Sequence, residues 1–185
     1  MKKTKIIDKY NFNDLSKVID NKGTTKAYKL AEDNNLPREW MTLEILKLEN
    51  PRIYPKNNYN TIASLLASNS KLPKEYMTLE ILKLPAYYYV NGDTIAHYLT
   101  KFTYNELPDQ CMNKEILSLT NEDLRTPAHN LAVHGNLPKK FRTKEILGLK
   151  DKLNISVSDE LNNYNRANPE FHKKIEKFLI KFLRI

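Results

Sequence analysis

Small and apolar residues recur along the chain in one arrangement that appears four times. Each copy begins with Thr-x-Ala-x-x-Leu-Ala or a close variant, which places small and apolar residues at i, i+3 and i+4 on one helical face. A Leu-Pro pair follows, and seven residues after its Pro comes Glu-Ile-Leu, the start of a second apolar stripe. Glu-Ile-Leu recurs after 36, 35 and 30 residues, and periods in this range are typical of stacked-repeat proteins.

Each copy predicts two short helices. The first carries a small alanine that lets a neighbouring helix approach closely: Ala27, Ala63, Ala96 and Ala128. The second opens at a residue whose side chain can accept a bond from an unpaired backbone N–H: Thr42, Thr78, Asn113 and Thr143. Between them, one position holds a side chain that we interpret as filling a core or part-buried slot: Trp40, Tyr76, Cys111 and Phe141. Because two such short helices cannot bury their apolar faces alone, the pattern predicts an all-α helix-turn-helix repeat solenoid with one continuous core.

The pattern continues in weaker form before the first copy and after the last. Asp14 precedes Thr25 by eleven residues, a spacing that also separates later copies, so residues 1–24 are predicted to form an N-terminal half-repeat cap. The segment 156–161 repeats 126–131 after thirty residues and begins a degenerate C-terminal capping repeat. The predicted single domain, 1–185, is divided into the cap 1–24, the repeats 25–60, 61–93, 94–125 and 126–155, and the capping repeat 156–185.

Two stretches resemble the ankyrin repeat. Thr-Pro-Ala-His-Asn-Leu-Ala at 126–132 is close to that family's Thr-Pro-Leu-His-x-Ala-Ala, and Gly-Asp-Thr-Ile-Ala-His at 92–97 is a second match. His134-Gly135 falls where the family turns after its first helix. The chain departs from the family in its Leu-Pro pair, in the missing Gly-Ala-Asp turn, and in two units longer than about 33 residues. The resemblance, over roughly residues 14 to 185, implies a divergent bacterial or phage-type solenoid that binds other proteins and has no catalytic centre.

The connectors between repeats differ in length. From Glu to the next Thr they span eleven residues before Thr126, fourteen before Thr94 and seventeen before Thr61, and the two long ones hold five of the eleven tyrosines. Lengthened loops on a regular scaffold often carry function, and tyrosine is favoured in interfaces. Alternatively, these tyrosines cover the ends of the helices. The predicted partner-binding residues are Arg52, Tyr54, Lys56, Tyr59, Tyr87, Tyr88, Tyr89 and Tyr104.

The charge balance favours an acidic partner. The net charge is +8 and the pI is about 9.3, which suits either a protein with an acidic surface or nucleic acid. The positive residues are scattered along the repeats without a dense stripe, so we favour the protein partner and keep a basic nucleic-acid-binding repeat protein as the alternative.

Motifs for catalysis and for metal binding are missing from the sequence. It has no Gly-rich phosphate loop, no His-Glu-x-x-His and no Ser-His-Asp order. The single Cys111 excludes an internal disulfide and a multi-cysteine zinc site. His97 and His129 occupy the same slot of adjacent units, about 8–10 Å apart and too far to share a zinc ion. The resemblance implies that this histidine bonds within and between turns. We therefore predict no enzyme, no cofactor and no metal.

The remaining features of the sequence concern the cellular location and role. No apolar run reaches the ~18 residues of a membrane span, and no signal peptide is apparent, which predicts a soluble cytoplasmic protein. Many Lys, Asn and Ile residues indicate a low-GC genome. A small repeat protein of such origin suggests an inhibitor that occludes a larger partner, for example a phage or mobile-element anti-defence protein. The last helix, opening at Asn168, has an apolar stripe that also allows a homodimer.

Overall fold

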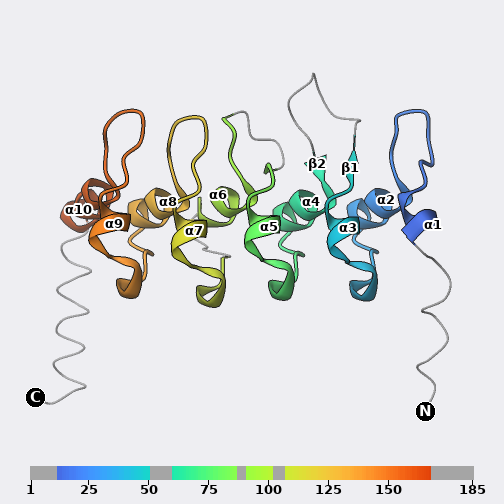
Figure 1. Cartoon of the computed structure of the whole chain (residues 1–185), viewed down its shortest axis with the longest axis horizontal. Helices are drawn as coiled ribbons and strands as arrows, with labels where there is room; N and C mark the ends of the chain where they lie inside the picture. The colour runs from blue at the N-terminus through green and yellow to red at the C-terminus, as the bar shows by residue number, and fades with distance from the viewer. Residues whose placement is uncertain (1–11, 51–59, 87–90, 102–106, 168–185) are drawn as a thin grey trace, which may run out of the picture.

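The computed structural model describes residues 12–50, 60–86, 91–101 and 107–167. Over these ranges the chain forms a row of short helices in chain order, with loops leaving one side of the row and short 3₁₀ turns on the opposite side (Figure 1). This arrangement confirms the predicted all-α repeat solenoid. The division into units at the stated residues remains a prediction.

Three kinds of element alternate along the row. The first helices are α2 (Lys26–Glu32), α4 (Ile62–Ser68), α6 (Ile95–Thr100), α8 (Pro127–Val133) and α10 (Val157–Ala167). The 3₁₀ turns are η2 (Arg38–Trp40), η3 (Lys74–Tyr76), η4 (Asp109–Cys111) and η5 (Lys139–Phe141). The second helices are α1 (Phe12–Ser16), α3 (Leu43–Leu46), α5 (Leu79–Leu82), α7 (Lys114–Leu117) and α9 (Lys144–Leu147).

The Leu-Pro pair explains the 3₁₀ turns, which the sequence analysis did not anticipate. Each proline has the extended backbone that its ring favours, as at Pro37 with φ −64° and ψ 143°, and the 3₁₀ turn starts directly after it. Each turn ends on the predicted slot residue, and all four slot residues pack half-buried against the core, as expected: Trp40, Tyr76, Cys111 and Phe141.

The predicted caps are present with one exception. The side chains of Thr42, Asn113 and Thr143 accept bonds from the backbone N–H three residues on, which begins α3, α7 and α9. Thr78 holds the same place before α5, but its side chain makes no such bond. The first helices α2, α4 and α8 are each followed by a residue with a left-handed backbone, as at Gly135 (φ 70°), where an added Cβ would collide with the Tyr164 ring. The turn predicted at Gly135 is therefore confirmed.

Stacked first helices form the core. The four predicted alanines have no exposed surface, and α2, α4, α6 and α8 each contact the next first helix, which for α8 is α10. At the N-terminal end, α1 contacts α2 and α3, and its Leu15 is buried in the core. The last helix, predicted to open at Asn168, lies outside the described residues. None of the described helices is long and apolar enough to cross a membrane.

Antiparallel pairing closes the base of the loops, which the sequence analysis did not predict. The strands β1 (Glu49–Asn50) and β2 (Asn60–Thr61) pair as Glu49 with Thr61, and Pro85 with Thr94 forms a single bridge. Val18 with Thr25 and Lys150 with Ser156 bridge in the same way. We call the loops that lead into each first helix fingers. The fingers 18–25, 120–126 and 150–156 are fully described, and those at 49–61 and 85–94 are described in part.

Candidate functional site

The eight residues predicted to bind a partner all lie outside the described residues. Those eight positions are Arg52, Tyr54, Lys56, Tyr59, Tyr87, Tyr88, Tyr89 and Tyr104. The described ends of the two long connectors are joined at β1 and β2 and at the bridge between Pro85 and Thr94. These described ends lie on the finger side of the row (Figure 1), and the tyrosines of the long connectors remain predicted contacts.

The fully described fingers share one turn. An Asp or Asn side chain five residues before the helix cap accepts bonds at 2.9–3.0 Å from the N–H groups two and four residues later: Asp20, Asn121 and Asp151. The residue two before the cap has a left-handed backbone in every finger where it is described: Gly23, Gly92, Leu124 and Asn154. Leu124 is the exception among them, because leucine does not readily adopt this conformation.

Backbone bonds join the tips of three consecutive fingers. The Glu122 N–H donates to the Asn91 carbonyl at 3.0 Å, and the Lys152 N–H donates to the Asp123 carbonyl at 2.9 Å. The Asp123 carboxylate also accepts from the Asn91 side chain at 3.1 Å and lies 3.6 Å from the Lys152 ammonium. These fingers therefore present one connected edge.

Two buried histidines connect each helix cap to the next finger. Nδ1 of His97 accepts from the Thr94 N–H at 3.2 Å, so Nε2 carries the proton and donates to the Arg125 carbonyl at 2.9 Å. His129 does the same with Thr126 and Ile155, each at 3.2 Å. Burial lowers the pKa of both imidazoles, which keeps them neutral. This is the structural role that the resemblance implied, and within the described ranges no three His, Cys, Asp or Glu side chains could hold a metal ion.

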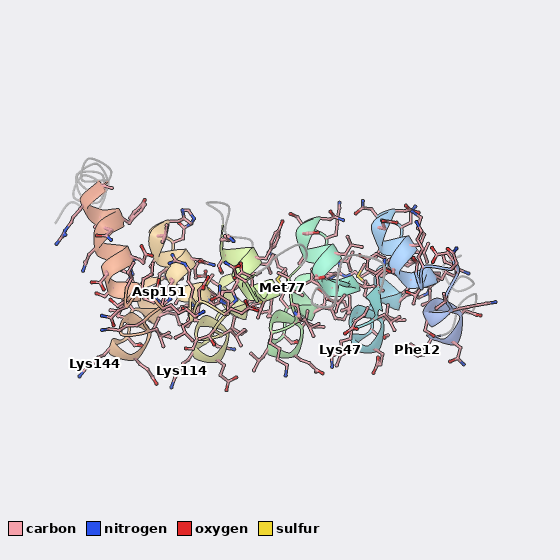
Figure 2. All side chains as sticks on the ribbon, turned by 90° about the horizontal axis from the view of Figure 1, so that it is seen from above. Phe12, Lys47, Met77, Lys114, Lys144 and Asp151 are labelled. Carbon is pink, nitrogen blue, oxygen red and sulfur yellow. The ribbon has the colours of Figure 1, made fainter. Side chains whose placement is uncertain are left out.

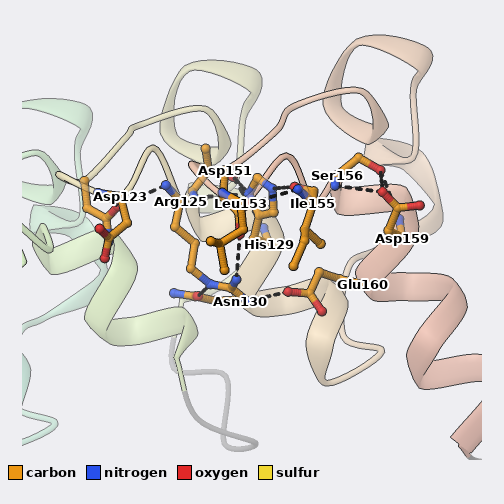
Figure 3. Close-up of polar contacts among 12 residues, drawn as sticks. Asp123, Arg125, His129, Asn130, Asp151, Leu153, Ile155, Ser156, Asp159 and Glu160 are labelled. Atoms are coloured by element: carbon orange, nitrogen blue, oxygen red, sulfur yellow. Dashed lines mark hydrogen bonds and ion pairs between the residues drawn. The ribbon is translucent and has the colours of Figure 1, made fainter.

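A polar network that the sequence analysis missed surrounds Arg125 (Figure 3). Its guanidinium donates to Glu160 of α10 at 2.9 Å, to the buried Asp151 at 3.4 Å and to Asn130 of α8 at 3.2 Å. Asn130 in turn donates to the His97 carbonyl at 3.2 Å. The Asp or Asn that recurs five residues before the caps is visible in the sequence and could have indicated the turns of this network. Arg125 has no counterpart in the other copies, so the sequence did not point to it.

Exposed ion pairs link the second helices and 3₁₀ turns of adjacent units. Lys47 pairs with Glu80, Lys114 with Glu145, and Arg38 with Glu75. Figure 2, seen from above, places Lys47 and Lys114 along the same edge of the row. Glu80 and Glu145 belong to the Glu-Ile-Leu motif, so this acid supports stacking in addition to its place in the first helical turn. Part of the positive charge is therefore neutralised within the chain.

The fold defines the chain as a helical-repeat protein. No known protein family and no curated protein matches the sequence. Among solved structures, the chain is similar to one from the complex of Bd0816, a predatory endopeptidase from Bdellovibrio bacteriovorus, with the immunity protein Bd3460. The matched chain is the immunity protein Bd3460. The TM-score is 0.57 at 16% identity, and the match covers 87% of this chain and 83% of that chain, a likeness of fold.

Proposed function

We propose that this chain is a non-enzymatic protein-binding module of ankyrin-like type that inhibits a larger partner by covering part of its surface. The observation that carries the proposal is the likeness of fold, over most of both chains, to an immunity protein solved in complex with an endopeptidase. Stacked repeats give a long and rigid surface, which suits such a role. The partner-binding residues proposed from the sequence lie in the two long connectors and, for Tyr104, in the third repeat: Arg52, Tyr54, Lys56, Tyr59, Tyr87, Tyr88, Tyr89 and Tyr104.

The joined fingers support this proposal. Bonds between the fingers around Asn91, Asp123 and Lys152 fix one edge of the chain before any partner arrives, which reduces the entropy lost on binding. The paired lysines on the second helices weaken the case for nucleic acid, because their charge is already offset by glutamates of the next unit. Inhibition by covering a surface suits a host defence protein and a protease equally well as the target.

The test is an affinity pull-down with the full chain from a lysate of its native host, with and without nuclease, followed by mass spectrometry. We expect one protein to be recovered in both conditions. Loss of all captured material after nuclease would contradict the proposal and support nucleic-acid binding. A variant with Tyr54, Tyr59, Tyr87, Tyr88 and Tyr89 changed to Ala tests the proposed contacts. It should keep the helical circular dichroism and lose capture.

A further inference from the structure

We infer that the tips of the fingers 120–126 and 150–156 anchor the partner through an apolar ridge, formed by Leu124 and Leu153, that enters an apolar hollow on the partner protein. The inference rests on the proposed function and adds a contact site outside the tyrosine connectors. Leu153 is 78% exposed and Leu124 is 49% exposed. The other large exposed apolar side chains of the described ranges, Phe12, Val18 and Ile19, lie at the N-terminal end.

The two leucines lie on adjacent, connected tips. The Lys152 N–H donates to the Asp123 carbonyl at 2.9 Å, and each leucine directly follows one of these two residues. A single exposed leucine is ordinary on a protein surface and needs no explanation. Here two exposed leucines stand on neighbouring tips whose backbones are hydrogen-bonded to each other, so both are held on one connected edge of the row.

The backbone conformation of Leu124 indicates that leucine was not selected at this position for the stability of the fold. Its φ is +56°, in the left-handed region where a Cβ crowds the following carbonyl. The equivalent position holds Gly23, Gly92 or Asn154 in the other fingers where it is described, and those residues adopt this region readily. A strained backbone that presents a half-exposed leucine is better explained by a contact outside the chain, since such strain gathers at binding sites.

The surrounding charges indicate which surface the ridge fits. Asp123 and Lys152, the residues that precede the two leucines, lie 3.6 Å apart and offset each other. The exposed Glu122 of one finger and the exposed Lys150 of the other are also opposite in sign, so the two tips carry no excess of positive charge for an anionic membrane surface. An apolar ridge whose flanking charges offset each other fits an apolar hollow on a protein. Its binding should depend little on salt, because charge pairs contribute little to it.

The test measures affinity and stability on the same variants. The probe is the protein captured by the unmodified chain in the pull-down, purified and titrated by calorimetry at low and high salt. We expect Leu124→Asn and Leu153→Asn each to weaken binding by about tenfold or more at both salt concentrations. The Tm of Leu124→Asn should stay unchanged or rise, because asparagine tolerates the left-handed backbone. Asn154→Gly, on the same finger, is the matched control and should leave the affinity unchanged.

Each other result overturns a distinct statement. Unchanged affinity of both leucine variants for a captured partner would remove the ridge and leave the proposed function standing, whereas failure to capture any protein would remove both. A clear fall in the Tm of Leu124→Asn would assign Leu124 to the fold. Concentration-dependent self-association that Leu153→Asn abolishes would assign the ridge to a second copy of this chain. Leu153-dependent binding to phosphatidylcholine–phosphatidylglycerol vesicles would assign it to a membrane surface.

Discussion

The two halves of the row stack through the same apolar contacts but are connected by different polar ones. In the C-terminal half, the third residue after the helix cap is His97 or His129, and each reaches the backbone of the next finger. In the N-terminal half, the same position holds Tyr28, which is buried, and Ser64, which donates to the Thr61 carbonyl of its own unit at 2.8 Å. Toward the C-terminus, the described residues thus include two buried histidine side chains that bond across to the next unit.

In the N-terminal half, exposed ion pairs link adjacent units. Arg38 with Glu75 and Lys47 with Glu80 join adjacent units through side chains that remain well exposed. Exposed pairs contribute little, whereas buried and fully bonded groups are costly to disrupt. Apolar stacking therefore sets the shape of this solenoid, and we expect the buried polar contacts to make the C-terminal units the more costly ones to disrupt.

The largest expected effect is a difference in the free energy of unfolding lost when the turn carboxylate of each half is removed. Asp151→Ala removes the acceptor of two N–H bonds and the partner of Arg125, and should lower the free energy of unfolding by about 2–3 kcal/mol. Asp20→Ala removes the same two backbone bonds from a part-buried turn and should cost about 1 kcal/mol. Urea unfolding of both variants checks this, and equal losses would refute the difference between the halves.

Stability should fall in mild acid, through the C-terminal half. Burial lowers the pKa of His97 and His129 in the folded chain, while an unfolded histidine titrates near about 6.5. The unfolded chain therefore binds more protons below this pH, and the histidine contribution to stability, complete above about 6.5, is lost as the pH falls through the lowered folded pKa. Urea midpoints at pH 7.5 and 5.5 should differ for the natural chain.

The histidine variants identify the source of this pH dependence. In the double variant His97→Gln and His129→Gln, the difference between the two midpoints should shrink, because no buried imidazole remains to be protonated. Ser64→Ala, at the equivalent position of the N-terminal half, should leave the difference intact. If the pH dependence of stability were unchanged in the double variant, titratable groups other than these two histidines would be its source.

The smallest effect should come from the exposed pairs. Lys47→Met or Glu80→Gln should change the free energy of unfolding by less than about 1 kcal/mol, and the coupling between them should decrease further in high salt. A double-mutant cycle at low and high salt measures this coupling. A coupling as large as the loss in Asp151→Ala would mean that the surface connects units as firmly as the interior does.

Local rules made much of the fold predictable. A cap at Thr42 or Asn113 and an alanine at Ala63 or Ala128 each act over three or four residues, so their spacing is visible in the sequence. The same rules placed Gly135 in a turn. They failed at Thr78, which is positioned as a cap and makes no cap bond, and they did not anticipate the 3₁₀ turn that each Leu-Pro pair starts.

The candidate site was only partly accessible to this reasoning. The tyrosine connectors were chosen for their length and composition, and they remain a prediction. The leucine ridge was not anticipated, because neither Leu124 nor Leu153 belongs to a repeated motif. The exposure of the two leucines and the left-handed backbone of Leu124 become visible only in three dimensions.

The period, the two helices of each unit and the residues that cap and stack them can be read from the sequence, because they depend on neighbours within one helical turn. Which polar groups meet across units follows from the three-dimensional stacking alone. His97 bonds to a carbonyl 28 residues away, and Arg125 bonds to Glu160 at a separation of 35. No local rule links residues so far apart, since stacking of the apolar helices must first bring the fingers side by side.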